Sequence, residues 1–442
     1  MTDLTFHDSE IRQPATEHRR SFSFLISAIE ASVIFFVFAL VNVNSFVRFR
    51  QFPEVDNYSD HEGDYILLAA LLVVLMILSL WRSRLLSDYF AAWKSNWSLI
   101  LFLIFSFSSL LWTVYFPATL YKLIFLSFST FAGSYLAVRY RAHGLIRILT
   151  WVGVIFAVLS VVVIEMIPLV GIMQNRPFVG SWVGIFWHRN HTGNIFAFFN
   201  MIALLRLLFD NEAASRQRLI FGLLYILSAA MVFGSRSATG LIVFLFLHFV
   251  TGLTFVWLRF HKRLKPWHYY AAGGMLLAAF LIFITNTAFF FGLLGRTPSM
   301  TGRIPLWEDL FRTVYLQNPL LGYGYGALWM QKSFRLFMQI RHHWPFQVYF
   351  ADNGFFDILL NLGVVGLLLF LAVYIPLGVR SFKQAVRSKH WLSFFPFLTF
   401  LYIFIGNLTY SFLLEVDQMV WLLLVTMVFL TTSPRSAKIP QP

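Results

Sequence analysis

The sequence predicts an all-α, polytopic membrane protein with about twelve transmembrane helices. Hydrophobic residues make up 58% of the 442 residues and charged residues only 12%, whereas soluble domains contain roughly 25% charged residues. The hydrophobic residues also form blocks near the ~17–25 residues that a helix needs to cross a bilayer. Because so few charges cannot cover a water-facing surface, most of the chain is expected to lie in lipid.

Each hydrophobic block is assigned one span, and the polar stretches between blocks are assigned to loops. The N-terminal segment carries both signs of charge, unlike a cleavable signal peptide, so the first block is expected to remain as an anchor. The predicted spans are 22–43, 65–81, 98–117, 120–138, 148–170, 190–209, 219–234, 238–257, 269–294, 362–378, 391–408 and 412–431. They divide the chain into an N-terminal tail (1–21), helices 1–9 (22–294), a long loop (295–361), helices 10–12 (362–431) and a C-terminal tail (432–442).

The distribution of basic residues predicts the orientation of the chain. A cytoplasmic N-terminus places 22 of the 34 Lys and Arg residues on the cytoplasmic side. Since cytoplasmic loops are enriched in Lys and Arg, both tails are expected in the cytoplasm. Membrane orientation and contact with membrane lipids also explain the net charge of +14 without nucleic acid, for which no motif is present.

The loop 295–361 is expected to be a folded extracytoplasmic subdomain. It is rich in Trp, Tyr, Phe and Gly and contains half of the basic residues assigned to the outer side. Loops of this length are usually functional or disordered, and this composition favours a folded one. The chain has no cysteine, which excludes disulfides and thiolate chemistry, and its scattered His residues do not suggest a metal site.

Four arginines on the predicted outer side are candidates for a binding site. Arg176 follows the fifth span, Arg189 lies in a polar cluster at the start of the sixth, Arg236 lies in a short turn, and Arg303 opens the long loop. An arginine at a membrane is costly unless it faces a polar cavity or a partner, although it can also snorkel to headgroups. Several converging guanidiniums would bind phosphate or pyrophosphate. The cluster around Arg189 also contains His188, Asn190 and His191.

The end of the long loop contains candidate acid–base residues. Asp352 and Asn353 come directly before a predicted membrane-entering helix. Asp352 can cap that helix, because a carboxylate accepts hydrogen bonds from the first amides. It can also accept a proton from a sugar hydroxyl as a general base. His342 and His343, which are otherwise surface histidines, are alternative bases.

Five short motifs between about residues 178 and 371 resemble those of the O-antigen ligase and polymerase superfamily of bacterial membrane glycosyltransferases. The resemblance rests on their order within a twelve-span layout, since no single motif is specific. The motifs are GIFWHRN from Gly184 to Asn190, Ser-Arg at Ser235 and Arg236, Gly-Arg-x-x-x-Trp from Gly302 to Trp307, Asn-Pro-x-x-Gly-x-Gly from Asn318 to Gly324, and an Asn-Gly helix start leading to Gly-x-x-Gly from Gly363 to Gly366.

The resemblance implies a GT-C-like fold in the bacterial inner membrane and a metal-independent, inverting transfer without a cofactor on its outer face. The donor would be a glycan on undecaprenyl pyrophosphate, and the acceptor a glycan or lipid A core sugar. Arg236 and Arg303 would hold the pyrophosphate while Asp352 activates the acceptor. The residues expected to bind substrate are His188, Arg189, Asn190, Arg176, Asn353 and Trp307.

This sequence departs from the family at the expected base. Many ligases have His-Asn where this chain has Asp352 and Asn353, and this difference slightly favours a polymerase over a ligase. A transporter or flippase of a lipid-linked or anionic substrate is the alternative function, since Glu30 and Glu165 lie within predicted spans. However, two carboxylates do not make a proton relay. A purely structural scaffold leaves the outer arginines unexplained.

Overall fold

The protein is described from a computed structural model that covers residues 29–42, 62–174, 178–260, 303–343, 348–388, 390–413 and 419–432. Within these ranges the chain is almost entirely helical and contains no strand; Ile172 and Trp182 form an isolated antiparallel bridge. The all-α prediction is therefore confirmed for the described residues.

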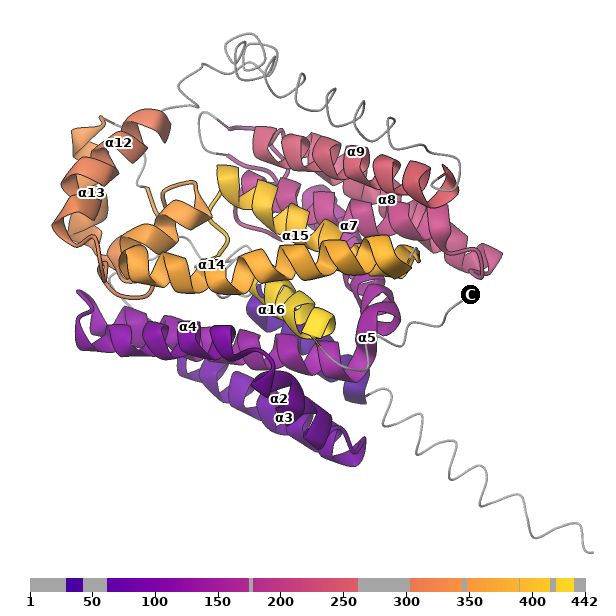
Figure 1. Ribbon diagram of the computed structural model, residues 1–442. Coiled ribbons are helices and arrows are strands. Elements are labelled where there is room, and N and C mark those ends of the chain that lie inside the picture. The colour runs from indigo at the N-terminus through magenta and orange to yellow at the C-terminus, as the bar shows by residue number, and fades with distance from the viewer. Residues whose placement is uncertain are drawn as a thin grey trace, which may run out of the picture.

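The long helices run side by side as a bundle (Figure 1). Shorter segments connect them: a helix over Ile29–Val41, α3 (Leu86–Lys94), α6 (Pro168–Gly171), and the 3-10 turns η1 (Ser109–Leu111), η3 (Tyr315–Gln317) and η4 (Leu328–Met330). The bundle consists of α2 (Glu62–Arg82), α4 (Trp97–Ser108), α5 (Phe116–Met166), α7 (Arg189–Phe209), α8 (Ser215–Gly234), α9 (Ala238–Phe260), α14 (Gly354–Ser388), α15 (Trp391–Thr409) and α16 (Met419–Thr432).

Seven helices in the described ranges are long and apolar enough to cross a membrane, or eight if the bent pair α3 and α4 counts as one span. These helices support the prediction of a polytopic membrane protein, but the predicted number of twelve transmembrane helices is not confirmed. The predicted span 269–294 lies outside the described residues. The predicted span 120–138 and most of the predicted span 148–170 are joined in α5, which ends at Met166 and whose backbone leaves helical geometry at Arg141 (φ 51°).

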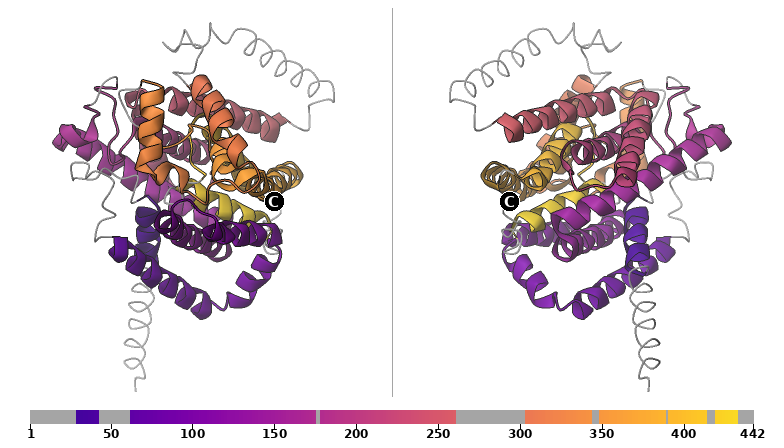
Figure 2. Two further views of the ribbon diagram at one scale, coloured as in Figure 1. Left: turned by 90° about the vertical axis from the view of Figure 1, so that its left-hand side faces the viewer. Right: turned by 90° about the vertical axis from the view of Figure 1, so that its right-hand side faces the viewer.

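Two helices gather at one end of the bundle. They are α12 (Arg303–Thr313) and α13 (Lys332–Arg341), which belong to the predicted loop 295–361. Figure 1 shows them beyond the end of α14, and the left-hand view of Figure 2 looks onto this end. The long helix after this loop begins at Gly354 instead of 362, because Asn353 starts it as a cap, and its backbone breaks at Gly363 (φ 65°).

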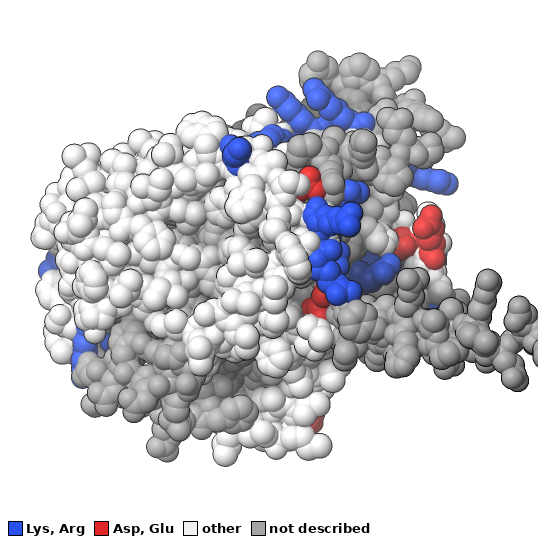
Figure 3. Space-filling model, turned by 90° about the horizontal axis from the view of Figure 1, so that it is seen from below, with Lys and Arg blue, Asp and Glu red and all other residues white. Residues whose placement is uncertain are grey.

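The opposite end of the bundle carries basic side chains. Seen from below, Lys and Arg gather at the end away from α12 and α13, beside a broad uncharged area (Figure 3). His390 interacts electrostatically with Glu212 and His143, so three connections that were all predicted to be cytoplasmic lie at one end. The positive-inside rule predicts such a concentration of basic residues on the cytoplasmic side of a membrane protein.

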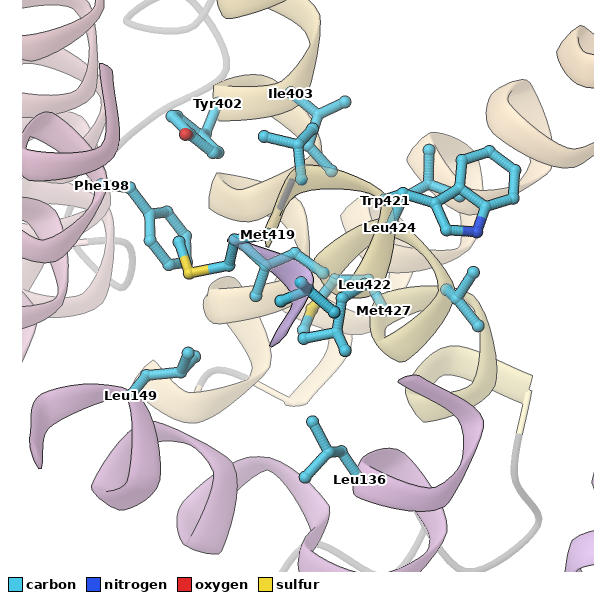
Figure 4. Packing of buried hydrophobic residues seen from close by; sticks show 14 of the residues in the cluster. Leu136, Leu149, Phe198, Tyr402, Ile403, Met419, Trp421, Leu422, Leu424 and Met427 are labelled. Atoms are coloured by element: carbon cyan, nitrogen blue, oxygen red, sulfur yellow. The ribbon is translucent and has the colours of Figure 1, made fainter. Parts of the chain in front are cut away.

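The centre of the bundle is formed by α16. Every residue from Met419 to Thr431 is buried, and Figure 4 shows Leu422 and Met427 packed among side chains from α5, α7 and α15. The indole of Trp421 donates a hydrogen bond to Thr130 Oγ1 at 2.9 Å. A helix that is apolar on all sides is buried on all sides, so the part of the predicted span 412–431 that α16 forms lies inside the protein.

Candidate active site

An ion pair joins the start of α12 to the residues before α14. Arg303 Nε donates to Asp352 Oδ2 at 2.8 Å, and 17% and 26% of the two side chains remain exposed. Four residues along the same helix face, Trp307 Nε1 donates to the carbonyl oxygen of Ala351 at 2.6 Å. Residues at i and i+4 share a helix face, so the Gly-Arg-x-x-x-Trp spacing directs both side chains to the 351–352 segment.

Asn353 caps α14. Its side-chain oxygen Oδ1 accepts hydrogen bonds from the amides of Phe355 at 3.1 Å and Phe356 at 3.0 Å, as an N-cap residue does. The interpretation of Asp352 as the cap is therefore wrong, since the cap is the residue directly before the helix. Asp352 instead adopts a left-handed backbone conformation (φ 56°), and its carboxylate meets Arg303.

A second polar cluster surrounds the turn between α8 and α9. Arg189 Nη1 donates to the carbonyl oxygen of Arg236 at 2.6 Å, and its guanidinium carbon lies 3.9 Å from the ring centre of Phe178. Ser237 Oγ donates to Asn190 Oδ1 at 2.9 Å. Arg189 is 5% exposed, whereas Arg236 is exposed and left-handed (φ 49°). Arg189 thus supports the turn that presents Arg236.

Two glycines let this cluster form. A Cβ on Gly240 of α9 would lie only 2.6 Å from the Cα of Gly193, which lies four residues after Arg189 in α7. Only glycine allows two backbones to approach so closely. The close crossing of α7 and α9 therefore brings the HRN segment against the Ser-Arg turn.

His188 links the two clusters. It caps α7, with Nδ1 accepting from the amide of Asn190 at 3.2 Å, and its ring stacks on Tyr410 at 6.1 Å between centroids. Although part of its surface is exposed, burial, together with the positive charges of Arg189 and Arg303, lowers the pKa of His188 to about 3. Since Arg303 acts on His188, the Arg303–Asp352 pair and the Arg189 cluster are neighbours.

The two glycine motifs at 318–324 and 363–366 pack against each other. The amide of Gly324 donates to Asn361 O at 2.9 Å, and the amide of Val364 donates to Pro319 O at 2.8 Å. A Cβ on Gly363 would overlap the carbonyl group of Leu320. The segment 318–324 thus holds the break of α14, which lies about ten residues after Asp352.

The remaining predicted residues have other positions. Arg176 lies outside the described residues. His342, an alternative base, has Nε2 at 3.2 Å from Asp309 Oδ2, which also accepts from Arg341 Nε at 2.6 Å. His343 is exposed. The contacts that the structure assigns to His342 therefore tie α12 to α13.

Sequence reasoning missed four supporting residues: Phe178 under Arg189, and Asp357, Trp329 and Ser411 beneath the Asp352 segment. The sequence does offer one signal for Asp357, because it is a carboxylate in an otherwise apolar helix start. Its partners Trp329 and Ser411 could not be identified, because they lie far away in the sequence. Among the described residues, no group of three or more His, Asp or Glu side chains is placed to hold a metal ion.

Comparison with known proteins identifies the region that contains this site. Residues 223–371 match a protein-family model described as O-antigen ligase, and this range includes Arg236, Arg303 and Asp352. A search of curated proteins finds no match. Four of the five motifs lie within the matched residues, and this region of the chain is therefore similar to the O-antigen ligase family.

Proposed function

We propose that this protein is a glycosyltransferase of the bacterial inner membrane that moves a glycan from undecaprenyl pyrophosphate to an acceptor sugar hydroxyl on the outer face. The acceptor is a lipid A core sugar in a ligase or a second lipid-linked glycan in a polymerase. The Arg303–Asp352 ion pair carries this proposal, because it unites a phosphate-binding group and a proton acceptor within the matched domain.

The free nitrogens of Arg303 suit it to the donor. Asp352 engages Nε, and the two terminal nitrogens have no hydrogen-bond partner among the described residues. A guanidinium edge of this kind fits two phosphate oxygens. Arg236, exposed at the neighbouring turn, would supply a second positive charge.

The proposed reaction is a single displacement. The acceptor oxygen forms a bond to the anomeric carbon while the bond from that carbon to the pyrophosphate oxygen breaks. The hydroxyl proton passes to Asp352, and undecaprenyl pyrophosphate leaves with the electron pair. Arg236 and Arg303 stabilise the charge that develops on the leaving group, a contribution that can reach several kcal/mol in a preorganised site. One displacement inverts the anomeric configuration.

The test is glycan transfer by the purified protein from a synthetic undecaprenyl-pyrophosphate donor, with chelator present. We expect Arg303→Ala and Asp352→Ala each to lower the rate by about 10²-fold or more. Arg312→Ala is the matched control, because Arg312 lies on the same helix in an exposed i,i+4 pair with Glu308 at 2.7 Å. Such exposed pairs contribute little, so this variant is expected to keep wild-type activity.

Normal transfer by Arg303→Ala would overturn the proposal. Substrate crossing the bilayer without glycan transfer would favour the transporter. Product length separates the two remaining possibilities, since a polymerase extends a lipid-linked glycan and a ligase caps an acceptor once.

A further inference from the structure

A buried carboxylate lies beneath the Asp352 segment. Asp357, in the first turns of α14, is 1% exposed. The amide of Ala351 donates to its Oδ1 at 3.2 Å and to its Oδ2 at 3.1 Å. Trp329 Nε1 donates to Oδ1 at 2.7 Å, and Ser411 Oγ donates to Oδ2. One side chain therefore joins η4, the 351 segment and the segment before α16.

The hydrogen-bond donors to Asp357 connect this buried carboxylate to the backbone next to Asp352. Burying a carboxylate is costly unless hydrogen bonds satisfy it, and an uncharged residue would pack an apolar helix start more cheaply. The amide held by Asp357 belongs to Ala351, the residue before Asp352. Asp352 itself has a left-handed backbone (φ 56°), a conformation that is uncommon for non-glycine residues, although Asp adopts it more readily than most.

The carbonyl of the same peptide segment is also held. Ala351 O accepts from Trp307 of α12, and Ala351 N donates to Asp357 of α14. The backbone before Asp352 is thus fixed from both sides, and Arg303 holds the Asp352 carboxylate from the side of α12.

We propose that Asp357 is a positioning residue that, with Trp329 and Ser411, orients the Asp352 carboxylate toward the acceptor hydroxyl; this inference rests on the proposed function. Asp357 has no direct contact with substrate and acts through the Ala351 amide. Misplacing a reacting group by about 1 Å can cost 10²-fold in rate, so its effect on transfer should exceed any effect on folding.

The experiment measures single-turnover transfer from the synthetic donor with enzyme in saturating excess, because the rate constant at saturation does not depend on the fraction of protein folded. Asp357→Asn is expected to lower it by about 10- to 100-fold, and Trp329→Phe and Ser411→Ala by about threefold or more. Two controls remove equivalent buried hydrogen bonds elsewhere: Trp421→Phe, whose indole bonds Thr130, and Ser381→Ala, whose hydroxyl bonds Gly378 O. Both should stay within about twofold of wild type.

A second readout does not require activity. Hydrogen exchange of the peptide 348–356 should be faster in Asp357→Asn than in wild type, while exchange in α7 is unchanged. A rate within twofold of wild type for Asp357→Asn, or equal losses in the controls, overturns the inference. If Asp357→Asn does not fold, the rates of Trp329→Phe and Ser411→Ala decide by the same criterion. If wild type transfers no glycan, the proposed function fails, and unchanged exchange at 348–356 would separately reject the positioning role.

Discussion

Arg189 and Arg236 come from one predicted set of arginines but occupy different environments. Arg189 is buried and uses a terminal nitrogen to hold the carbonyl oxygen of Arg236. Arg236 keeps its own side chain exposed. The two residues therefore form a unit in which one arginine supports the backbone and the other is available to an anion.

Removing the supporting guanidinium should loosen the turn. Arg189→Met keeps most of the side-chain volume but removes the hydrogen bond to Arg236 O, a net loss of about 1 kcal/mol for a typical intramolecular hydrogen bond. We expect a lower melting temperature in detergent and slower glycan transfer. Arg312→Met, at an exposed site on α12, should change neither. An unchanged melting temperature for Arg189→Met would contradict the supporting role.

The lowered pKa of His188 predicts that the stability of the folded protein depends on pH. Because its pKa in the fold is about 3, against 6.5 for an unperturbed histidine, the folded protein keeps it neutral while the unfolded chain protonates it. The stability that the neutral ring contributes is full above pH 6.5 and is lost as the pH falls toward 3. His188→Asn retains a capping side chain without this titration. Melting temperatures measured from pH 8 to 4 should fall more steeply for wild type than for the variant; parallel curves would refute the assignment.

At the scale of elements, the break of α14 depends on glycine. Gly363 has φ 65°, and a Cβ there would overlap the carbonyl group of Leu320. The amide of Val364 next to it bonds Pro319 O. The helix start that carries Asn353 and Asp357 is therefore held against the segment 318–324, and a side chain at Gly363 would force the two apart.

Gly363→Ala should consequently lower the yield of folded protein and its melting temperature. Gly222→Ala is the matched control, because Gly222 lies within α8 and a Cβ there meets nothing within 4 Å. That substitution should be neutral or stabilising by about 0.5–1 kcal/mol. Equal melting temperatures for the two variants would show that the break does not need glycine.

An internal ion pair connects the first helix to the bundle. Arg139 Nη2 lies 2.9 Å from each carboxylate oxygen of Glu30, and Ser79 Oγ donates to the same carboxylate at 3.0 Å. Glu30, a carboxylate within a predicted span, is thus paired with an arginine. This contact ties three helices together, whereas a proton path would need further carboxylates along the bundle.

At the scale of the whole molecule, the basic side chains at the end away from α12 and α13 predict that this end faces the cytoplasm. The chain has no cysteine, so single cysteines can be labelled without background. Ser333→Cys, exposed on α13, should react with a membrane-impermeant maleimide in spheroplasts. Ser215→Cys, exposed at the start of α8, should react only after permeabilisation. The reverse pattern would invert the orientation.

The sequence by itself determined the class of the protein and the location of most helices. A hydrophobic block locates a helix because its residues partition into lipid or protein interior instead of water. This property is local, so the helix can be located without knowing its tertiary contacts. The same blocks could not distinguish a lipid-facing span from α16, because lipid and protein interior are equally apolar. They also could not separate the cap Asn353 from Asp352, its neighbour, by propensity alone.

Only the tertiary structure decided how the site residues are used. Spacing within a motif placed Arg303 and Trp307 on one helix face, but the partners of Asp357 come from residues 329, 351 and 411. The burial of Arg189 likewise depends on a turn 47 residues away. Such contacts form when helices distant in sequence pack together, and no local pattern specifies them, because side chains of the same chemistry can face either solvent or a buried partner.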